Sequence, residues 1–444
     1  MKVSGSSTIR SRPAASAFEA IAVCVATVLL GTVGLAGPAL ANDEGAADIR
    51  EALTKGKPTL NVRGRIEIAD QTGRLRSEAY TVRTRLGYGT KPFHGVSIYA
   101  DFENIAAATA TTYFDPTNPW NPWLTTIAEP PATEINQGFL MVDRPDWLGT
   151  KAIGGRQSIV LDDSRFIGNV IWRQNEQTYD AAWVQSSAGV DGLTVRYSWI
   201  GRVNRIFGGG GTNSALTDFE SNSHVVNASF TKFDQARIVG FVYLLDLVLP
   251  FQPTIAAQNA NSSKAFGGRV TGTLDLTEKL HLLYQGSYAY QSNYGAKSTP
   301  YSANYGLVDV GIKYDDLGTL GGGYEHLGTS NGIQQFSTPL ATLHKFNGWA
   351  DVFLNNGGPG GLRDFHAYVA PKLPWKLKMK LVYHRFWSDS NSAVLGNEID
   401  GLIGRPVGKY LDLLFKAAYF DAAAGAPAAI QTTYRVWFDV TVKF

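Results

Sequence analysis

Cysteine is nearly absent from this chain of 444 residues, because only Cys24 occurs. Cys24 lies in an N-terminal segment that we expect to be removed from the mature protein. A chain without cysteine can form no disulfide, no thiolate nucleophile and no cysteine metal site. The absence excludes the enzyme and metal-site classes that depend on sulfur, and it suits a chain that crosses an oxidising periplasm.

The N-terminal segment has the three parts of a secretory signal. Its basic start consists of Lys2, Arg10 and Arg12. An apolar stretch follows over about residues 20–35, and Ala39-Leu40-Ala41 fits a small-x-small cleavage site. The apolar stretch is shorter than the roughly 20 residues of a spanning helix. We expect a signal peptide over residues 1–41 and a short periplasmic tail over residues 42–57.

Neither sign of charge is in excess after this cleavage. The whole chain carries 40 basic and 38 acidic residues, and the signal holds three of the former and one of the latter, which leaves 37 of each. A neutral total gives no support to nucleic-acid binding, which uses an excess of Lys and Arg. Any charge selectivity must come from where the charges lie.

Long apolar runs are missing beyond the signal. No segment approaches the length of a spanning helix, so a membrane protein of this sequence has only a closed β-barrel as its spanning structure. Aromatic residues and glycine are plentiful, with 20 Tyr, 22 Phe, 10 Trp and 47 Gly. Aromatic girdles at the two membrane interfaces account for the aromatic residues, and crowded strand positions account for the glycines.

The C-terminal segment Tyr434–Phe444 alternates strictly. One parity is wholly apolar and the other is mostly polar, from Arg435 to Lys443. Because side chains in a strand alternate between faces, this pattern predicts a strand with lipid on one side and water on the other. An edge strand of a soluble sheet is the alternative, but it does not explain why the apolar parity continues to Phe444. A C-terminal aromatic residue is typical of outer-membrane barrels, and we expect the barrel-assembly machinery to bind Phe444.

Similar alternation recurs along the mature sequence, for example in residues 60–68, 96–103, 193–199, 376–384 and 411–419. About nineteen candidate strands can be counted, and since single-chain bacterial barrels have an even number we expect 18. Short connections, such as 91–95, 145–149, 315–318 and 371–375, roughly alternate with long ones, such as 106–133, 207–223, 249–263 and 291–304. The sequence therefore predicts an all-β fold, a transmembrane antiparallel barrel over residues 58–444, with short periplasmic turns and long external loops.

Several short motifs resemble the alginate export protein family of outer-membrane barrels. They are His344–Asp351, Gly361–Asp364, Val382–Trp387, Gly396–Asp400, Gly155–Gln157, Asp162-Asp163, Arg165, Trp172–Asn175 and Tyr179–Ala181. With the barrel pattern, the resemblance covers most of residues 59–444. It implies an 18-stranded barrel whose charged lumen passes an acidic polysaccharide outward.

Selectivity in a pore comes from like charges gathered at its narrow part. The resemblance places the constriction arginine of the family's Gly-Arg-Gln motif on Arg156. The lumen parity of the expected strands adds further candidates for a positive wall: Arg63, Arg65, Arg83, Arg85, Lys378 and Lys380. Acidic candidates that could face this wall are Glu67, Asp101, Glu103, Asp364 and Glu398. The simpler interpretation is that these charges pair with one another and only solvate the wall.

Other residues favour plainer roles. His344 and His384 are expected on strands as hydrogen-bonding residues, and no His-x-x-x-His pair of metal-ligand type occurs, so we expect no metal. Residues 208–211 are four glycines without the ending of a phosphate loop, and an external loop explains them. The Pro- and Trp-rich segment Asp115–Trp123 favours a rigid loop at the barrel mouth over a carbohydrate platform.

The sequence thus predicts a passive outer-membrane channel without cofactor, not an enzyme, for anionic or polar solutes and possibly an acidic polysaccharide such as alginate. A general or small-organic-acid uptake porin is the alternative. A barrel enzyme is a remote one, because Asp364, His366 and His384 lie close in sequence but no Gly-x-Ser-x-Gly motif accompanies them. An adhesin or purely structural barrel is equally remote. The expected partners are outer-membrane lipid, the solute and the barrel-assembly machinery, with no nucleic acid.

Overall fold

The computed structural model describes residues 45–444 apart from 109–110, 119, 209–215, 251, 253 and 298. The expected signal peptide, its cleavage site and Cys24 lie outside the described residues. Of the expected periplasmic tail, residues 45–56 are described and contain the short helix α2 (Ile49–Thr54), whose N-cap Asp48 accepts a hydrogen bond from the backbone N–H of Glu51. Within the described ranges, no helix is long and apolar enough to cross a membrane.

Eighteen long antiparallel strands form one sheet in the described part of the chain. They are β1 (Lys57–Gln71), β2 (Ser77–Gly89), β3 (Val96–Ala107), β4 (Ala132–Arg144), β5 (Thr150–Gln157), β6 (Thr178–Ser186), β7 (Leu193–Asn204), β8 (Asp218–Phe233), β9 (Ala236–Leu245), β11 (Ser263–Asp275), β12 (Leu280–Ser292), β13 (Ser302–Tyr314), β14 (Gly318–Leu327), β17 (Leu362–Pro371), β18 (Lys378–Trp387), β19 (Val394–Val407), β20 (Leu411–Ala422) and β21 (Thr433–Lys443). The two-residue β10 (Leu247–Val248) continues the pairing of β9 with β8 in the same register. A small separate hairpin consists of β15 (Thr329–Ser330) and β16 (Gln334–Gln335).

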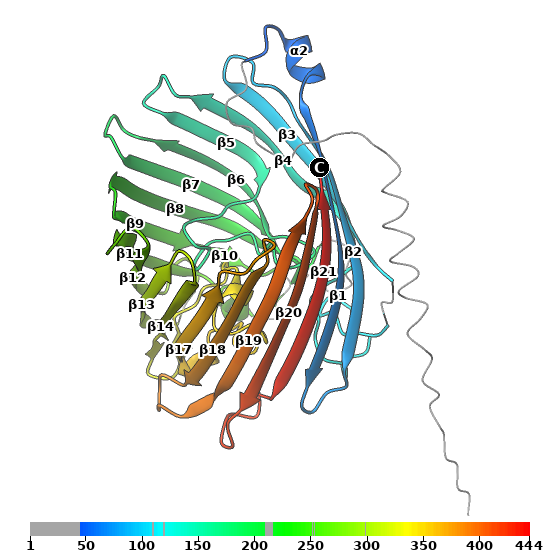
Figure 1. The fold of residues 1–444 in the computed structure, drawn as a ribbon, viewed down its shortest axis with the longest axis vertical. Coiled ribbons are helices and arrows are strands. Elements are labelled where there is room, and N and C mark those ends of the chain that lie inside the picture. Colours follow the sequence, from blue (N-terminus) through cyan, green and yellow to red (C-terminus); the bar gives the residue numbers. More distant parts are fainter. Residues whose placement is uncertain are drawn as a thin grey trace, which may run out of the picture. The chain divides into compact units, whose positions relative to one another are not determined.

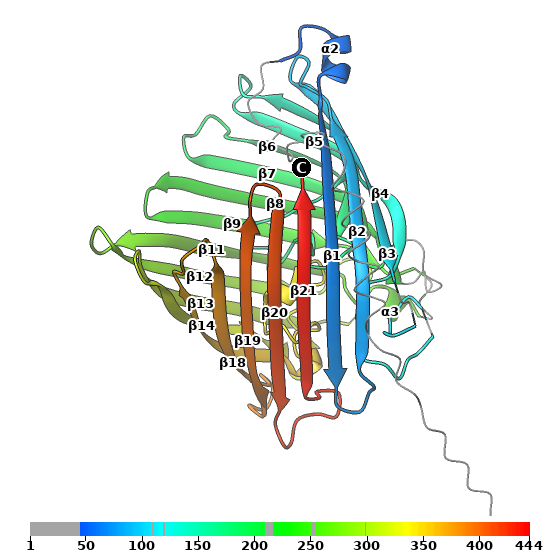
Figure 2. The same ribbon diagram turned by 45° about the vertical axis from the view of Figure 1, so that its right-hand side comes forward.

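The sheet closes on itself because the first strand pairs with the last. β1 and β21 run antiparallel from Asn61 opposite Lys443 to Gln71 opposite Thr433, and Figures 1 and 2 show the blue β1 beside the red β21. The backbone N–H of Phe444 also donates to the carbonyl oxygen of Leu60 over 2.9 Å. The predicted closed antiparallel barrel of 18 strands is therefore confirmed.

The alternation read from the sequence separates the two faces of the barrel. On β3, Ile98 and Phe102 are exposed outward, whereas Asp101 and Glu103 between and beyond them are buried. On β21, Tyr434 and Phe438 are exposed and Trp437 is fully buried. Since the exposed parity is apolar on strand after strand, the outer face is suited to lipid and the polar parity faces the lumen.

Connections at one end of the barrel are short and at the other end long, as predicted. The short ones include the turn between β8 and β9 and the turn between β19 and β20. By the rule that periplasmic turns are short, this end faces the periplasm and holds the C-terminus. The longest connections, 108–131, 158–177 and 328–361, belong to the opposite end. Only the first of these was among the predicted long loops, and the other two were not predicted.

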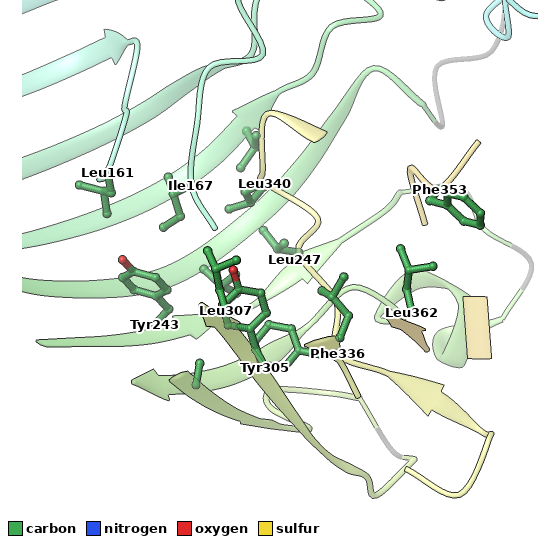
Figure 3. Close-up of a cluster of buried hydrophobic side chains, with 14 of the residues drawn as sticks. Leu161, Ile167, Tyr243, Leu247, Tyr305, Leu307, Phe336, Leu340, Phe353 and Leu362 are labelled. Atoms are coloured by element: carbon green, nitrogen blue, oxygen red, sulfur yellow. The ribbon is translucent and has the colours of Figure 1, made fainter. Parts of the chain in front are cut away.

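Two of these long loops fold into the lumen and form a hydrophobic cluster there. Ile167 of the loop 158–177 forms an isolated parallel bridge with Leu340 of the loop 328–361, so the two loops contact each other directly. Both leucine and isoleucine side chains are fully buried against inward aromatic residues of the wall, among them Tyr243 (Figure 3). The core of this protein therefore lies inside the barrel, between the wall and the inward loops.

The third long loop carries the Pro- and Trp-rich segment. Asp115 is buried and its carboxylate accepts a hydrogen bond from the backbone N–H of Thr117 over 2.8 Å, whereas Trp120 and Trp123 are exposed. Leu75 pairs with Leu124 across the loop. The segment is thus held to the barrel by its ends, and a carbohydrate-binding role for its tryptophans stays a hypothesis.

Candidate functional site

The predicted basic residues of β1 and β2 lie side by side on the lumen face. Arg63 stands directly opposite Arg83, and Arg85 stands opposite Asn61. Arg65 is the next residue along β1 on the same face, because residues two apart in a strand point the same way. Like charges opposite each other destabilise a sheet, so these guanidinium groups require compensation from other parts of the chain.

Arg63 is compensated by uncharged groups of the loop 158–177. Its Nε donates to Gln174 Oε1 over 2.9 Å, one terminal nitrogen donates to the carbonyl oxygen of Ile171 over 3.1 Å, and the other donates to the carbonyl oxygen of Arg173. No carboxylate oxygen of the described residues lies within 4.0 Å of its guanidinium. Arg63 therefore keeps its positive charge without an ion pair.

Arg83 has the same character. It donates to Asn61 Oδ1 over 2.7 Å and to the carbonyl oxygen of Gln174 over 3.4 Å, while its buried Nε has no hydrogen-bond partner. Over the part of the chain that the structure describes, it also has no carboxylate within 4.0 Å. The two neighbouring guanidinium groups of Arg63 and Arg83 are thus hydrogen-bonded to uncharged groups and have no carboxylate partner among the described residues.

Arg65 and Arg85 differ, because both are paired with carboxylates. Arg65 lies 2.8 Å from Asp439 on the neighbouring strand and 2.9 Å from Glu129 of the loop 108–131. Arg85 forms an ion pair with Glu103, one of the predicted acids. For these two arginines the simpler interpretation, in which wall charges neutralise one another, describes the structure.

Asp101, the other predicted acid, lies beside this group on β3. Its carboxylate accepts hydrogen bonds from the backbone N–H of Gln137 over 2.7 Å and from the side-chain amide of Asn136 over 3.2 Å. Asp101 also lines a cavity of about 510 Å³. It is the one acidic side chain among that cavity's lining residues, beside the terminal carboxylate of Phe444.

This cavity, called the basic cavity below, begins at the short-turn end of the barrel. Its charged lining residues are Arg83, Arg85, Lys409, Lys443 and Asp101. Lys409 belongs to the turn between β19 and β20, and Ile171 of the inward loop also lines the cavity. Of its four basic side chains, Arg85 is paired with Glu103 and Lys443 with Asp412, so within the described residues Arg83 and Lys409 are the cations of this lining without an ion pair. A narrow low-dielectric wall concentrates the field of such unpaired charges.

Arg156 lies elsewhere. On β5 it stands opposite Asp180 of β6, and its guanidinium binds that carboxylate over 2.7 and 3.1 Å. Tyr179 and Ala181 on either side of Asp180 are buried in the cluster inside the barrel, so Asp180 and Arg156 point to the opposite, outer face. The structure does not bring Arg156 together with the arginines of β1 and β2.

Lys378 and Lys380 are on β18, away from the basic cavity. Lys378 is exposed near the turn that precedes the strand. Lys380 lies 4.7 Å from the centre of the Tyr368 ring and lines a second cavity of about 280 Å³. That cavity also contains Asp364 and His366, and it is called the histidine cavity below.

The other predicted acids are anchors for the inward loops. Glu67 binds Arg173 of the loop 158–177 over 3.2 Å. Glu398 accepts a hydrogen bond from the backbone N–H of Ala350 over 2.6 Å. These carboxylates do not face the positive wall across open water as predicted. They hold backbone and arginine groups of the loops in place.

Sequence reasoning missed the residues that tie the two inward loops to each other. Arg173 reaches from one loop to Asp351 of the other over 2.5 Å, and Arg165 reaches Asn347 Oδ1 over 3.0 Å and Glu325 of β14 over 2.6 Å. All of these except Glu325 lie in the short motifs of the sequence analysis. The sequence signal that could have identified these residues is the clustering of the motifs in segments that form long loops.

His344 is part of this network and not of a strand, which corrects the sequence-based expectation. It lies in a 3-10 turn, η2 (Leu343–Lys345), and stacks on Trp172 at 4.5 Å between ring centres. Its Nδ1 lies 2.7 Å from Asp351 and its Nε2 lies 2.7 Å from Lys416 Nζ. Since an ammonium group can only donate, Nε2 accepts and Nδ1 carries the proton.

Burial and the neighbouring Lys416 lower the pKa of His344 to about 3, although Asp351 acts in the opposite direction. For Asp351, burial alone would raise the pKa, but His344 and Arg173 outweigh burial and hold the pKa below its usual value. At neutral pH the loop network therefore contains a neutral His344 imidazole beside the Asp351 carboxylate.

Comparison with known proteins reaches this chain through its fold alone. No family model matches the sequence, and no curated protein sequence matches it. Among solved structures, Acinetobacter baumannii OccAB2 is similar, with a TM-score of 0.66 and 13% identity over 89% of this chain and 99% of that chain. Pseudomonas aeruginosa OccD3 (OpdP) gives a TM-score of 0.63 and 12% identity over 93% and 95%, and P. aeruginosa OpdL gives 0.62 and 12% over 88% and 98%.

The chain shares the barrel fold of these solved structures. Each alignment spans nearly the whole length of the solved chain. The outward apolar parity and the closed sheet agree with an outer-membrane location. The comparisons support the general porin type and do not show the alginate export family to which the motifs pointed.

Proposed function

We propose that this protein is a passive channel through which small anionic or polar solutes diffuse across the outer membrane. The observation that carries the proposal is Arg83, a lumen guanidinium that faces the basic cavity without a carboxylate partner. A solute carboxylate would supply the partner that Arg83 lacks, because guanidinium and carboxylate groups form strong, charge-assisted hydrogen bonds. The porin fold of the similar structures supports the same class of function.

The inward loops favour a small solute over a polysaccharide such as alginate. The loops 158–177 and 328–361 contact each other inside the lumen, and the cluster around Ile167 and Leu340 is fully buried. A stiff polymer would need a continuous wide path past this cluster. A small organic anion needs only the space beside it, and the uptake-porin alternative of the sequence analysis is the form that we adopt.

We do not propose an enzyme. His384 is hydrogen-bonded to Asp364 over 2.9 Å, but no serine hydroxyl of the described residues is bonded to it. A nucleophile activated by a histidine base requires that contact or one close to it.

Assembly of the barrel supplies a second partner. In the closed barrel the Phe444 ring stacks on Tyr410 at 4.7 Å between ring centres. We propose that the barrel-assembly machinery binds Phe444 before β21 pairs with β1, because afterwards the strand edge is no longer free.

The proposal is tested by the reversal potential of the refolded mature barrel in a planar bilayer under a salt gradient. We expect a preference for anions in the wild type and a clear loss of that preference in Arg83→Gln, which keeps hydrogen-bonding groups but removes the charge. Arg65→Lys is the matched control, because Arg65 is already neutralised by Asp439 and keeps its charge in the variant. A cation preference in the wild type, or an unchanged reversal potential in Arg83→Gln, would contradict the proposal.

A further inference from the structure

Three potential metal ligands converge in the histidine cavity. His366 of β17 and His384 of β18 are directly opposite each other in the sheet, and Asp364 lies two residues from His366 on the same face. One ligand atom from each of the three residues lies within 4.8 Å of the others. The sequence lacks the helical His-x-x-x-His spacing, but paired strands bring two histidines together without it.

The distance between the closest two ligand atoms is already that of a metal site. His384 Nδ1 lies 2.9 Å from Asp364 Oδ1. Zinc bonds to nitrogen and oxygen are about 2 Å long, so two ligands of one ion lie about 3 Å apart. A bound ion would replace the hydrogen bond between these atoms with two coordinate bonds.

Each histidine has a carboxylate near its Nε2, on the side of the ring away from Nδ1. His366 Nε2 lies 2.8 Å from Asp309 Oδ2, and His384 Nε2 lies 3.6 Å from Asp400 Oδ2. At His366 this is the arrangement in which a metal-binding histidine donates its remaining N–H to an outer carboxylate, which fixes the tautomer and orients the ring. At His384 the outer carboxylate lies near the ring nitrogen but beyond hydrogen-bond distance. These positions leave Nδ1 of both rings for the ion, and within the described ranges Nδ1 of His366 has no hydrogen bond.

The remaining surroundings hold the ligands and admit an ion. Asp364 Oδ2 accepts a hydrogen bond from Asn347 Nδ2 of the inward loop over 3.1 Å, and Tyr368 donates to Asp309 over 3.0 Å. The cavity of about 280 Å³ is lined by all three ligands. Its lining contains four carboxylates, those of Asp163, Asp309, Glu325 and Asp364, against the ammonium groups of Lys345 and Lys380.

We propose that Asp364, His366 and His384 bind a divalent transition-metal cation of the zinc class inside the lumen. Two imidazoles and one carboxylate suit Zn²⁺, Ni²⁺ or Cu²⁺, whereas Mg²⁺ and Ca²⁺ prefer oxygen ligands alone. Three protein ligands leave at least one coordination position for water or for a solute group. The site is independent of the anion preference proposed above, because it lies in the other cavity.

Titration of the refolded, untagged barrel with Co²⁺ tests the proposal. Cobalt takes the place of zinc and gives visible absorption bands whose intensity reports a low coordination number. We expect saturation at one Co²⁺ per barrel and displacement of the bands by Zn²⁺. His366→Ala and His384→Ala should each weaken binding by a factor on the order of 10–100 or more, since each removes one of three ligands.

His326→Ala is the matched control, because His326 is also paired with an aspartate, Asp389, at 2.9 Å but lies outside the histidine cavity. Asp364→Asn preserves the shape of the side chain and keeps the test valid if an alanine variant does not fold, which heat-dependent gel mobility would reveal. The proposal is overturned if the wild type binds no Co²⁺ or Zn²⁺ stoichiometrically. It is also overturned if His366→Ala, His384→Ala and Asp364→Asn, once folded, bind as tightly as His326→Ala.

Discussion

The two lumen cavities share one design and differ in charge. The charged side chains that line the basic cavity are four basic ones and one carboxylate, whereas those that line the histidine cavity are four carboxylates and two lysines, beside two imidazoles. Both are formed by inward residues of neighbouring strands, and the loop 158–177 contributes to each, through Ile171 to the first and Asp163 to the second. The neutral total charge therefore includes one cavity with more basic than acidic side chains and one with more acidic than basic side chains.

The two cavities also differ in which groups form hydrogen bonds with the charged side chains nearby. Around Arg63, backbone carbonyl oxygens of the inward loop accept the hydrogen bonds, so the positive charge is kept. Around Asp364, imidazole and amide groups donate, so the carboxylate is kept. The hydrogen-bond acceptors around Arg63 are uncharged, so they stabilise its buried charge without an opposing charge, whereas Asp364 forms an ion pair whenever His384 is protonated.

The largest effect on stability and conductance is expected from removing the contact between the inward loops 158–177 and 328–361. Arg173→Ala removes the contact of one inward loop with Asp351 of the other and with Glu67 of the wall. Removal of one partner of a buried ion pair costs about 3–5 kcal/mol, because the other charge is left uncompensated. We expect a lower unfolding temperature in detergent. We also expect a larger, noisier single-channel conductance, because the two inward loops are no longer held to each other inside the lumen.

Arg202→Ala is the control for this variant. Arg202 pairs with Asp218 at 3.2 Å, but its side chain is 48% exposed, and exposed pairs contribute little to stability. Equal effects of the two substitutions on unfolding and conductance would show that Arg173 does not hold the loops.

Acid should weaken the contacts between the two inward loops more gradually. The pKa of His344 is lowered to about 3 from 6.5 by burial beside Lys416, so between these pH values the unfolded chain binds a proton that the folded chain does not. Stability from this group is present above pH 6.5 and is lost as the pH falls towards 3. We expect the unfolding temperature to decrease between pH 7 and pH 4.

The variant that isolates this effect is His344→Gln, which cannot titrate. Its unfolding temperature should be lower than that of the wild type at pH 7 and should fall less steeply between pH 7 and pH 4. If both proteins lose stability in parallel over this range, His344 is not the group responsible.

The sequence predicted the barrel well because the information is local and repeated. The alternation within each segment, such as Tyr434–Phe444, indicates which of its faces meets lipid. The even strand number follows from closure of the barrel. The basic residues of β1 and β2 were found for the same reason, since parity alone places Arg63 and Arg83 in the lumen.

The parts that failed depend on contacts far apart in sequence. Whether Arg65 is free or neutralised is decided by Asp439, which joins it only when the barrel closes. The pairing of His366 with His384 is decided by the register of β17 and β18. Inward folding of a loop and the register between strands are tertiary properties, and alternation does not report them.

The smallest effect is expected at Arg156, whose charge belongs to neither cavity. The family resemblance predicts that Arg156→Glu shifts ion preference towards cations, because the motif arginine lines the constriction. The structure predicts almost no shift, since Arg156 and Asp180 lie on the outer face and bind each other. The substitution would place two carboxylates together at a partly exposed position, which costs on the order of 1 kcal/mol at most. Reversal potentials of Arg156→Glu and Arg83→Glu under the same salt gradient decide the matter. A large shift in the first and none in the second would reverse the assignment of the selective residues and place the constriction at β5.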